Sequence, residues 1–178
     1  ALAAALARHR PRAVFPAGAF GAALRTAAAL VHGAPTARVV SVELPGFDTH
    51  CDQPRRHGQR LAILDAGLSA LLADLGASAR GRAAVVLVFS ELGRTLEENP
   101  ARGTGHGRAG PVLIAGGLVR GGFYGAPPSL AALDRGALVP TTDFRSVYAT
   151  VIASLFAVDL AAVLGGTYPR LGFLPAQC

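Results

Sequence analysis

The feature that most constrains the fold is a near-continuous apolar run, Ala-Ala-Val-Val-Leu-Val-Phe, at residues 83–89. A strand of a half-exposed sheet alternates apolar and polar residues, whereas a strand that is covered on both faces has an unbroken apolar sequence. A long amphipathic helix is predicted just before it, at residues 56–75, because leucines recur there at helical spacing: Leu61, Leu64, Leu68, Leu71, Leu72 and Leu75. A helix followed by a doubly covered strand is typical of an α/β protein.

Other segments continue this alternation of helix and strand. Spacing and composition predict helices at 1–8, 17–31 and 142–158, strands at 38–44 and 111–115, and a hairpin at 116–125. We therefore expect a mostly parallel sheet flanked by helices, within a single domain that covers residues 1–178. Three or four strands are few for such a sheet, so either the domain is small or the remaining strands belong to sequence outside this chain.

The composition argues against several classes of protein. Hydrophobic residues make up 51% of the 178-residue chain and the mean hydropathy is +0.40, so the chain can bury a sizeable core. No apolar run is long enough to span a bilayer. The net charge of +6 does not indicate nucleic-acid binding, because the arginines are scattered and there is no Trp to stack on bases. We expect neither a membrane span nor a nucleic-acid partner.

Polar side chains gather in two loops that follow predicted strands. The first loop, Gly-Phe-Asp-Thr-His-Cys-Asp-Gln at 46–53, follows the strand at 38–44. The second, at 90–110, follows the apolar run and ends in a glycine-rich stretch. Because ligands of open α/β sheets bind outside the carboxyl ends of the strands, we expect the two loops to meet at one edge.

The side chains in these loops form a mixed oxygen and nitrogen ligand set. Such a set suits zinc, manganese or iron better than calcium. We predict a divalent-metal site whose ligands are Asp48, His50, Glu91 and His106. Arg94 adds a fixed cation that can bind a phosphate or sulfate with two parallel hydrogen bonds.

Each of these residues also has a simpler interpretation. Asp48 can cap a turn and His50 can hydrogen-bond a backbone carbonyl. Glu91 and Arg94 can form a surface ion pair that contributes little to stability. The glycines at 103–110 can cradle an anion through their backbone amides. The remaining candidates are expected to be unremarkable solvent-side or loop residues: His9, His32, His57 and Cys51.

Several motifs together resemble a known bacterial family. They are GFDTHCDQ, SELGRTLEEN, GTGHG followed by PVLIAGGLVRGGFYG, TTDFRSVYATVI and the closing LGFLP. In order and spacing they resemble the domain of unknown function 1501 family, a distant member of the alkaline phosphatase and sulfatase superfamily. The resemblance runs from about Phe15 to the end of the chain, and it implies that the chain is the carboxyl-terminal portion of a larger alkaline-phosphatase-like domain.

The resemblance implies a fold and a set of roles. It implies an alkaline-phosphatase-like sheet sandwiched by helices, with metals at its carboxyl edge. By superfamily analogy Asp48 and His50 bind metal after one core strand, Glu91 is the acidic ligand after the next, and His106 is the late metal-binding histidine. Relatives are longer, often with a twin-arginine export signal, so the resemblance also implies an exported, periplasmic or extracellular protein and an absent amino-terminal half as a partner.

One departure from the family pattern concerns the third motif. Relatives commonly carry Gly-Thr-Asp-His-Gly, whereas Gly105 stands here in place of the Asp. A lost carboxylate removes a ligand or a partner that orients His106. The superfamily's nucleophile has no candidate in the chain.

The expectation that follows is a metal-dependent hydrolase of small-molecule phosphate or sulfate esters, inactive as this fragment. The alternative is a non-catalytic exported binding or scaffold protein that retains the fold.

Overall fold

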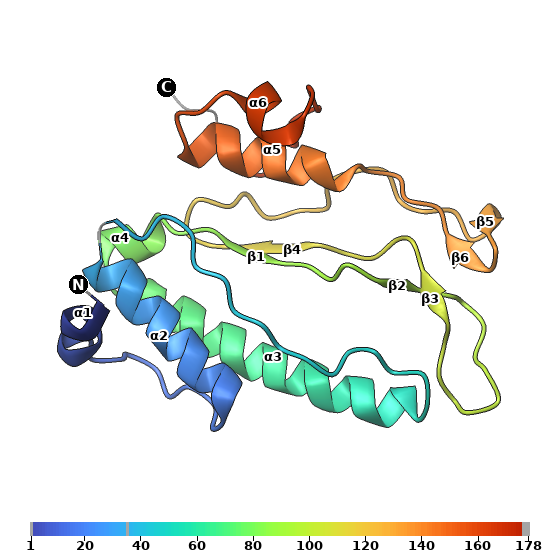
Figure 1. Ribbon diagram of the computed structural model, residues 1–178, viewed down its shortest axis with the longest axis horizontal. Coiled ribbons are helices and arrows are strands. Elements are labelled where there is room, and N and C mark those ends of the chain that lie inside the picture. Colours follow the sequence, from blue (N-terminus) through green and yellow to red (C-terminus); the bar gives the residue numbers. More distant parts are fainter. Residues whose placement is uncertain (1, 35, 176–178) are drawn as a thin grey trace. The chain divides into compact units, whose positions relative to one another are not determined.

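The computed structural model describes residues 2–34 and 36–175 (Figure 1). The chain divides into two compact units, which are described separately. Unit 1 comprises Ala1–Val86, Glu98–Thr104 and Ala115–Gly117, and unit 2 comprises Leu87–Glu97, Gly105–Ile114 and Leu118–Cys178.

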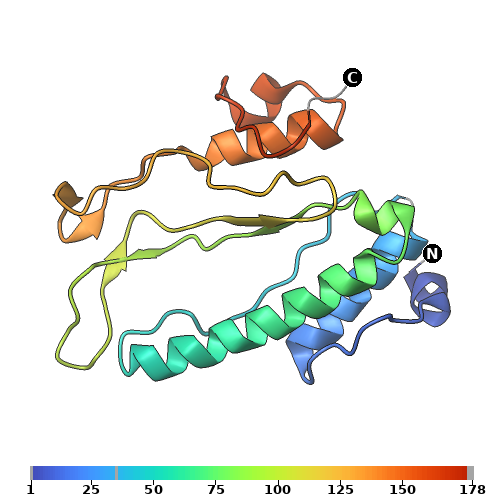
Figure 2. The same cartoon turned by 180° about the vertical axis from the view of Figure 1, so that it is seen from behind.

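Unit 1 is built from four helices: α1 (Leu2–Arg8), α2 (Ala19–Gly33), α3 (Gln53–Leu75) and α4 (Ala79–Arg82). Helix α2 packs against each of the other three, and both views show α2 and α3 side by side (Figures 1 and 2). Helix α3 begins after Asp52, whose backbone is left-handed at φ 45°, and carries a proline in its first turn, where the missing N–H is not needed. The predicted helix at 56–75 is therefore confirmed and starts three residues earlier.

The core of unit 1 lies between α2 and α3. Leu24 and Ala28 on α2 face Leu71 and Leu75 on α3, and all four are buried. Each pair is four residues apart, which places both members on one face of its helix. Burial of each leucine contributes about 1.5–3 kcal/mol. Partly buried apolar residues complete this core: Phe15, Phe20, Val31, Val42, Ala84 and Val86.

Two expectations for unit 1 are wrong in detail. Residues 38–44 form no strand in the described chain, although Val42 still packs on the core. Valine favours extended backbone, but a strand also needs a neighbouring strand to pair with, and local sequence does not specify that neighbour. Leu61, predicted to be buried, is 47% exposed, because the contacts of α3 with α2 concentrate in its second half, around Leu71 and Leu75.

Unit 2 contains short strands. Strands β1 (Val86–Val88) and β4 (Leu113–Ala115) pair with each other, and they confirm strands within the predicted segments 83–89 and 111–115. Strands β2 (Gly93–Arg94) and β3 (His106–Gly107) form an antiparallel pair. A hairpin of β5 (Leu133–Asp134) and β6 (Ala137–Leu138) was not expected, whereas the predicted hairpin at 116–125 forms no strand.

Two helices close unit 2: α5 (Phe144–Leu155) and α6 (Leu160–Leu164). Asp143 caps α5 by accepting a hydrogen bond from the backbone N–H of Arg145 at 2.9 Å. The carboxylate satisfies an amide of the first turn that has no partner within the helix. Within the described residues the strands form three two-stranded sheets, and the mostly parallel sheet stays a prediction. No helix among the described residues is both long and apolar enough to cross a membrane.

Candidate functional site

The loop that carries Asp48 and His50 has a specific backbone path in unit 1. It begins at Gly46, whose φ of 98° is readily adopted only by glycine. A Cβ at this position would lie 2.6 Å from Nε of Arg60 on α3, so a side chain would also displace that guanidinium. Thr49, in the middle of the loop, is only 1% exposed, and its amide donates to the Phe47 carbonyl at 2.9 Å. The buried threonine anchors the loop while its neighbours on both sides stay at the surface.

Asp48 and His50 lie on either side of this anchor and meet. Oδ1 of Asp48 is 2.9 Å from Nε2 of His50, and the side chains are 60% and 47% exposed, respectively. An exposed pair of this kind contributes between about 0 and 1 kcal/mol to stability. Ligand atoms at about 2.0–2.2 Å from one ion lie roughly 3 Å apart. A carboxylate oxygen and an imidazole nitrogen at this separation, both accessible to solvent, therefore fit the ligand atoms of a divalent cation.

Asn99, in the second loop, holds the backbone of His50 in place. Nδ2 of Asn99 donates to the His50 carbonyl at 3.1 Å. Oδ1 of Asn99 accepts from the amides of Ala101 at 3.0 Å and Gly103 at 2.9 Å. The amide side chain of Asn99 thus stabilises its own turn and also links this turn to the loop at 46–53 by a hydrogen bond.

Backbone contacts extend this junction within unit 1. The amides of Asp52 and Gln53 donate to the carbonyls of Ala101 and Arg102 at 3.0 and 2.8 Å. A Cβ on Gly103 would lie 2.1 Å from the carbonyl carbon of His50, so only glycine fits there. The segment at 98–104 therefore contacts the 46–53 loop, whereas the meeting of the two loops at the edge of a parallel sheet stays a prediction.

In unit 2, Arg94 and His106 are directly opposite each other across the β2–β3 pair. Thr95 continues this pairing, because its amide donates to the Gly105 carbonyl at 3.0 Å and its Oγ1 accepts from the Gly105 amide at 2.9 Å. This register places the predicted anion-binding residue, Arg94, opposite the predicted histidine ligand, His106, on the neighbouring strand. Glu91 is exposed on a bend just before β2.

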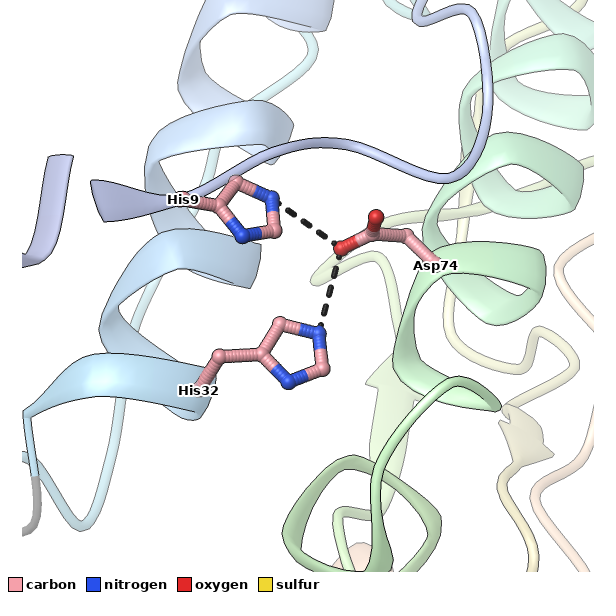
Figure 3. Close-up of side chains that lie close together, drawn as sticks. All are labelled: His9, His32 and Asp74. Atoms are coloured by element: carbon pink, nitrogen blue, oxygen red, sulfur yellow. Dashed lines mark hydrogen bonds and ion pairs between the residues drawn. The ribbon is translucent and has the colours of Figure 1, made fainter. Parts of the chain in front are cut away.

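A third group of polar side chains lies in unit 1 and was not predicted from the sequence. His9 follows α1, His32 ends α2 and Asp74 lies on α3, and the two imidazoles converge on one carboxylate (Figure 3). Asp74 is 0% exposed. The expectation that His9 and His32 are ordinary solvent-side residues is wrong, since their side chains are 8% and 18% exposed. One signal was available: Asp74 lies three residues after Leu71, on the buried stripe of its helix.

The comparisons with known proteins define the family. Residues 4–164 match the family described as "Protein of unknown function (DUF1501)". No curated protein and no solved structure shows a significant match to the chain. The match covers most of the chain, including α2, α3 and the loops that carry Asp48, His50, Arg94 and His106. The chain belongs to the DUF1501 family of proteins of unknown function.

Proposed function

We propose that this DUF1501 protein is a metal-dependent hydrolase that acts on phosphate or sulfate esters. The observation that carries the proposal is the pairing of Asp48 and His50 at 2.9 Å on an anchored, solvent-accessible loop. A carboxylate and an imidazole at this separation are ligand types that zinc and manganese share. Export from the cytoplasm, implied by the resemblance to relatives with twin-arginine signals, belongs to the same proposal.

The roles follow from the chemistry of each side chain. Asp48 and His50 would hold the ion, and Glu91 and His106 are the further ligands that the sequence predicts. A bound divalent ion polarises an ester oxygen and lowers the pKa of bound water. Arg94 would bind the non-bridging oxygens of the ester in the planar, two-pronged geometry that a guanidinium provides. No residue of the chain is assigned as the nucleophile.

Metal analysis tests the ligand assignment. The purified protein is loaded with Zn²⁺ or Mn²⁺, and bound metal is counted in the wild type, Asp48→Ala and His50→Ala. His57→Ala is the matched control, since His57 lies near the start of α3 and packs edge-on against the Phe47 ring, with 5.6 Å between the ring centroids. We expect both site variants, and not the control, to lose metal. Unchanged metal content in both site variants would overturn the assignment.

A non-catalytic binding or scaffold role is the second candidate, and Gly105 favours it. Glycine stands there in place of the acidic residue that relatives commonly carry, and it lies next to His106. A panel of phosphate and sulfate esters separates the two candidates. Turnover that depends on added metal and is lost in His50→Ala supports the hydrolase, whereas metal binding without turnover supports the binding role.

A further inference from the structure

We propose that His9, His32 and Asp74 form a second divalent-metal site in unit 1 and that this site binds zinc. This site is independent of Asp48 and His50 and does not depend on the proposed hydrolase function. Three separate elements contribute to it: the segment after α1, the last turn of α2 and the second half of α3 (Figure 3).

The distances suit shared coordination of one ion. Nε2 of His9 and Nε2 of His32 each lie 3.2 Å from Oδ2 of Asp74. The ligand atoms of all three residues lie within 4.8 Å of one another. Tetrahedral ligands at about 2.0–2.1 Å from zinc are separated by roughly 3.3 Å, which matches both imidazole–carboxylate distances. The two rings are stacked with their centroids 5.2 Å apart, so they would have to turn toward a shared ion.

The unsatisfied nitrogen of His9 points to a missing ligand. Its side chain is 8% exposed, yet Nε2 makes no hydrogen bond within the described part of the chain, although Asp74 Oδ2 is 3.2 Å away. A hydrogen bond requires the N–H of His9 to point at Oδ2 of Asp74. Coordination instead requires the lone pairs of His9 Nε2 and Asp74 Oδ2 to point at the ion, which lies at a third position. A buried nitrogen left without a partner destabilises the fold, and a bound ion would remove this penalty.

The other two ligands are oriented by hydrogen bonds on their far sides. Oδ1 of Asp74 accepts from the backbone amide of Arg12 at 2.6 Å, and Oδ2 lies 3.2 Å from His32 Nε2, where an ion would replace the shared proton. Nδ1 of His32 lies 2.8 Å from Oγ of Ser78. When Nδ1 donates its proton to this hydroxyl, the Nε2 lone pair of His32 is available for coordination.

The position of Ser78 is fixed by the local fold. Ser78 caps α4, and its Oγ accepts from the amide of Gly81 at 2.9 Å. One hydroxyl therefore caps the start of α4 and orients His32 in the last turn of α2. Oriented ligands of this kind are typical of metal sites, where the partners of the ligands tune affinity by about 10- to 100-fold.

The charge of Asp74 gives a second reason to expect a cation. A carboxylate that is 0% exposed needs a compensating positive charge, and the groups nearest its Oδ2 are the imidazoles of His9 and His32, which carry a charge only when protonated. The contact with Arg12 is made by its backbone, and the Arg10 guanidinium donates to the carbonyls of Ala7 and His9. Coordination of an ion by all three ligands would supply the charge at the carboxylate itself.

Space for a fourth ligand lies beside the cluster. A cavity of about 140 Å³ is lined by the three residues together with Arg10, Arg12, Ala77 and Ser78. Three protein ligands and one open position are typical of zinc sites that exchange water or bind an anion. The flanking arginines favour a water-derived hydroxide or a small anion at that position.

The experiment uses the full chain in an Asp48→Ala, His50→Ala background, so that any remaining metal reports on this cluster alone. Zn²⁺ binding is measured by calorimetry after removal of metal with a chelator, and Co²⁺ is added to record the visible spectrum of a four-coordinate site. We expect one equivalent of bound ion and an intense cobalt spectrum. No bound Zn²⁺ in this background would overturn the proposal, whatever the outcome for Asp48 and His50.

Variants assign the ligands. His9→Gln and His32→Gln should each weaken Zn²⁺ binding by at least about 100-fold, and Ser78→Ala by about 10-fold or more. His57→Gln, a histidine variant outside the cluster, should leave binding unchanged. Circular dichroism of each variant separates loss of metal from loss of fold, and Ser78→Ala serves if a histidine variant misfolds. Binding that survives in both His9→Gln and His32→Gln would also overturn the proposal.

Discussion

The side chain of Asn99 donates a hydrogen bond from Nδ2 to the backbone carbonyl of His50 at 3.1 Å, although 49 residues separate them along the chain. The same side chain accepts two backbone amide hydrogen bonds from its own turn. The position of a predicted metal ligand therefore depends on a residue in a different loop, and this dependence can be tested.

Asn99→Ala should destabilise the protein and loosen the His50 loop. It removes three hydrogen bonds, each worth about 1 kcal/mol before discounting for solvent exposure. Asn99→Asp is the matched variant, because it keeps the acceptors for Ala101 and Gly103 and replaces the donor to His50 with a carboxylate oxygen. Urea unfolding should rank wild type above Asn99→Asp, and Asn99→Asp above Asn99→Ala. Equal stability for all three would show that the Asn99 contacts are not needed to hold this loop.

Gly103→Ala should be more disruptive than its small size suggests. The new Cβ would lie 2.1 Å from the His50 carbonyl carbon and 2.2 Å from its oxygen, so backbone must move. Overpacking of this kind costs about 1–3 kcal/mol. Gly58→Ala is the control, since nothing lies within 4 Å of a Cβ there and the position is within α3. That control should gain up to about 1 kcal/mol from helix propensity, so thermal melts should move in opposite directions.

Gly105→Asp should strengthen metal binding if His106 is a ligand of the proposed hydrolase site. The new Cβ would lie 3.3 Å from Oγ1 and 3.4 Å from Cγ2 of Thr95, a tight contact that a small shift relieves. The substitution adds a carboxylate beside His106, where it can ligate or orient the imidazole. Gly105→Asn has nearly the same shape without the charge. Mn²⁺ or Zn²⁺ titrations should show tighter binding for the Asp variant alone, and equal affinities would argue against this role.

The α5 cap should make stability depend on pH in the acid range. The side-chain hydrogen bond from Arg145 lowers the pKa of Asp143, and the backbone amide of Arg145 lowers it further. Because the folded-state pKa lies below the unfolded value, the stabilisation is complete above roughly pH 4 and is lost as the pH falls through the folded-state pKa. Thermal melts at descending pH should show this loss in the wild type. In Asp143→Asn, which cannot titrate, the melting temperature should fall less over the same range.

Local sequence determined the helices and the apolar strand segments. Leucines spaced three and four residues apart predicted the helix at 56–75, and the structure has α3 at Gln53–Leu75. The apolar runs at 83–89 and 111–115 contain β1 and β4. These features depend on neighbours within a few residues, so a single sequence carries the information. Whether residues 38–44 pair with another strand depends on a distant partner, so the strand predicted there from local composition does not form in the structure.

The tertiary structure decided which polar side chains meet. Asp48 and His50, two residues apart, were predictable as a pair because one loop presents both. His32 and Asp74 are 42 residues apart, and neither gave a motif. They meet because the buried faces of α2 and α3 pack around Leu24, Ala28, Leu71 and Leu75, which brings the end of α2 to the second half of α3. Periodicity sets the face of each helix, whereas the packing of two helices sets which of their residues lie opposite each other.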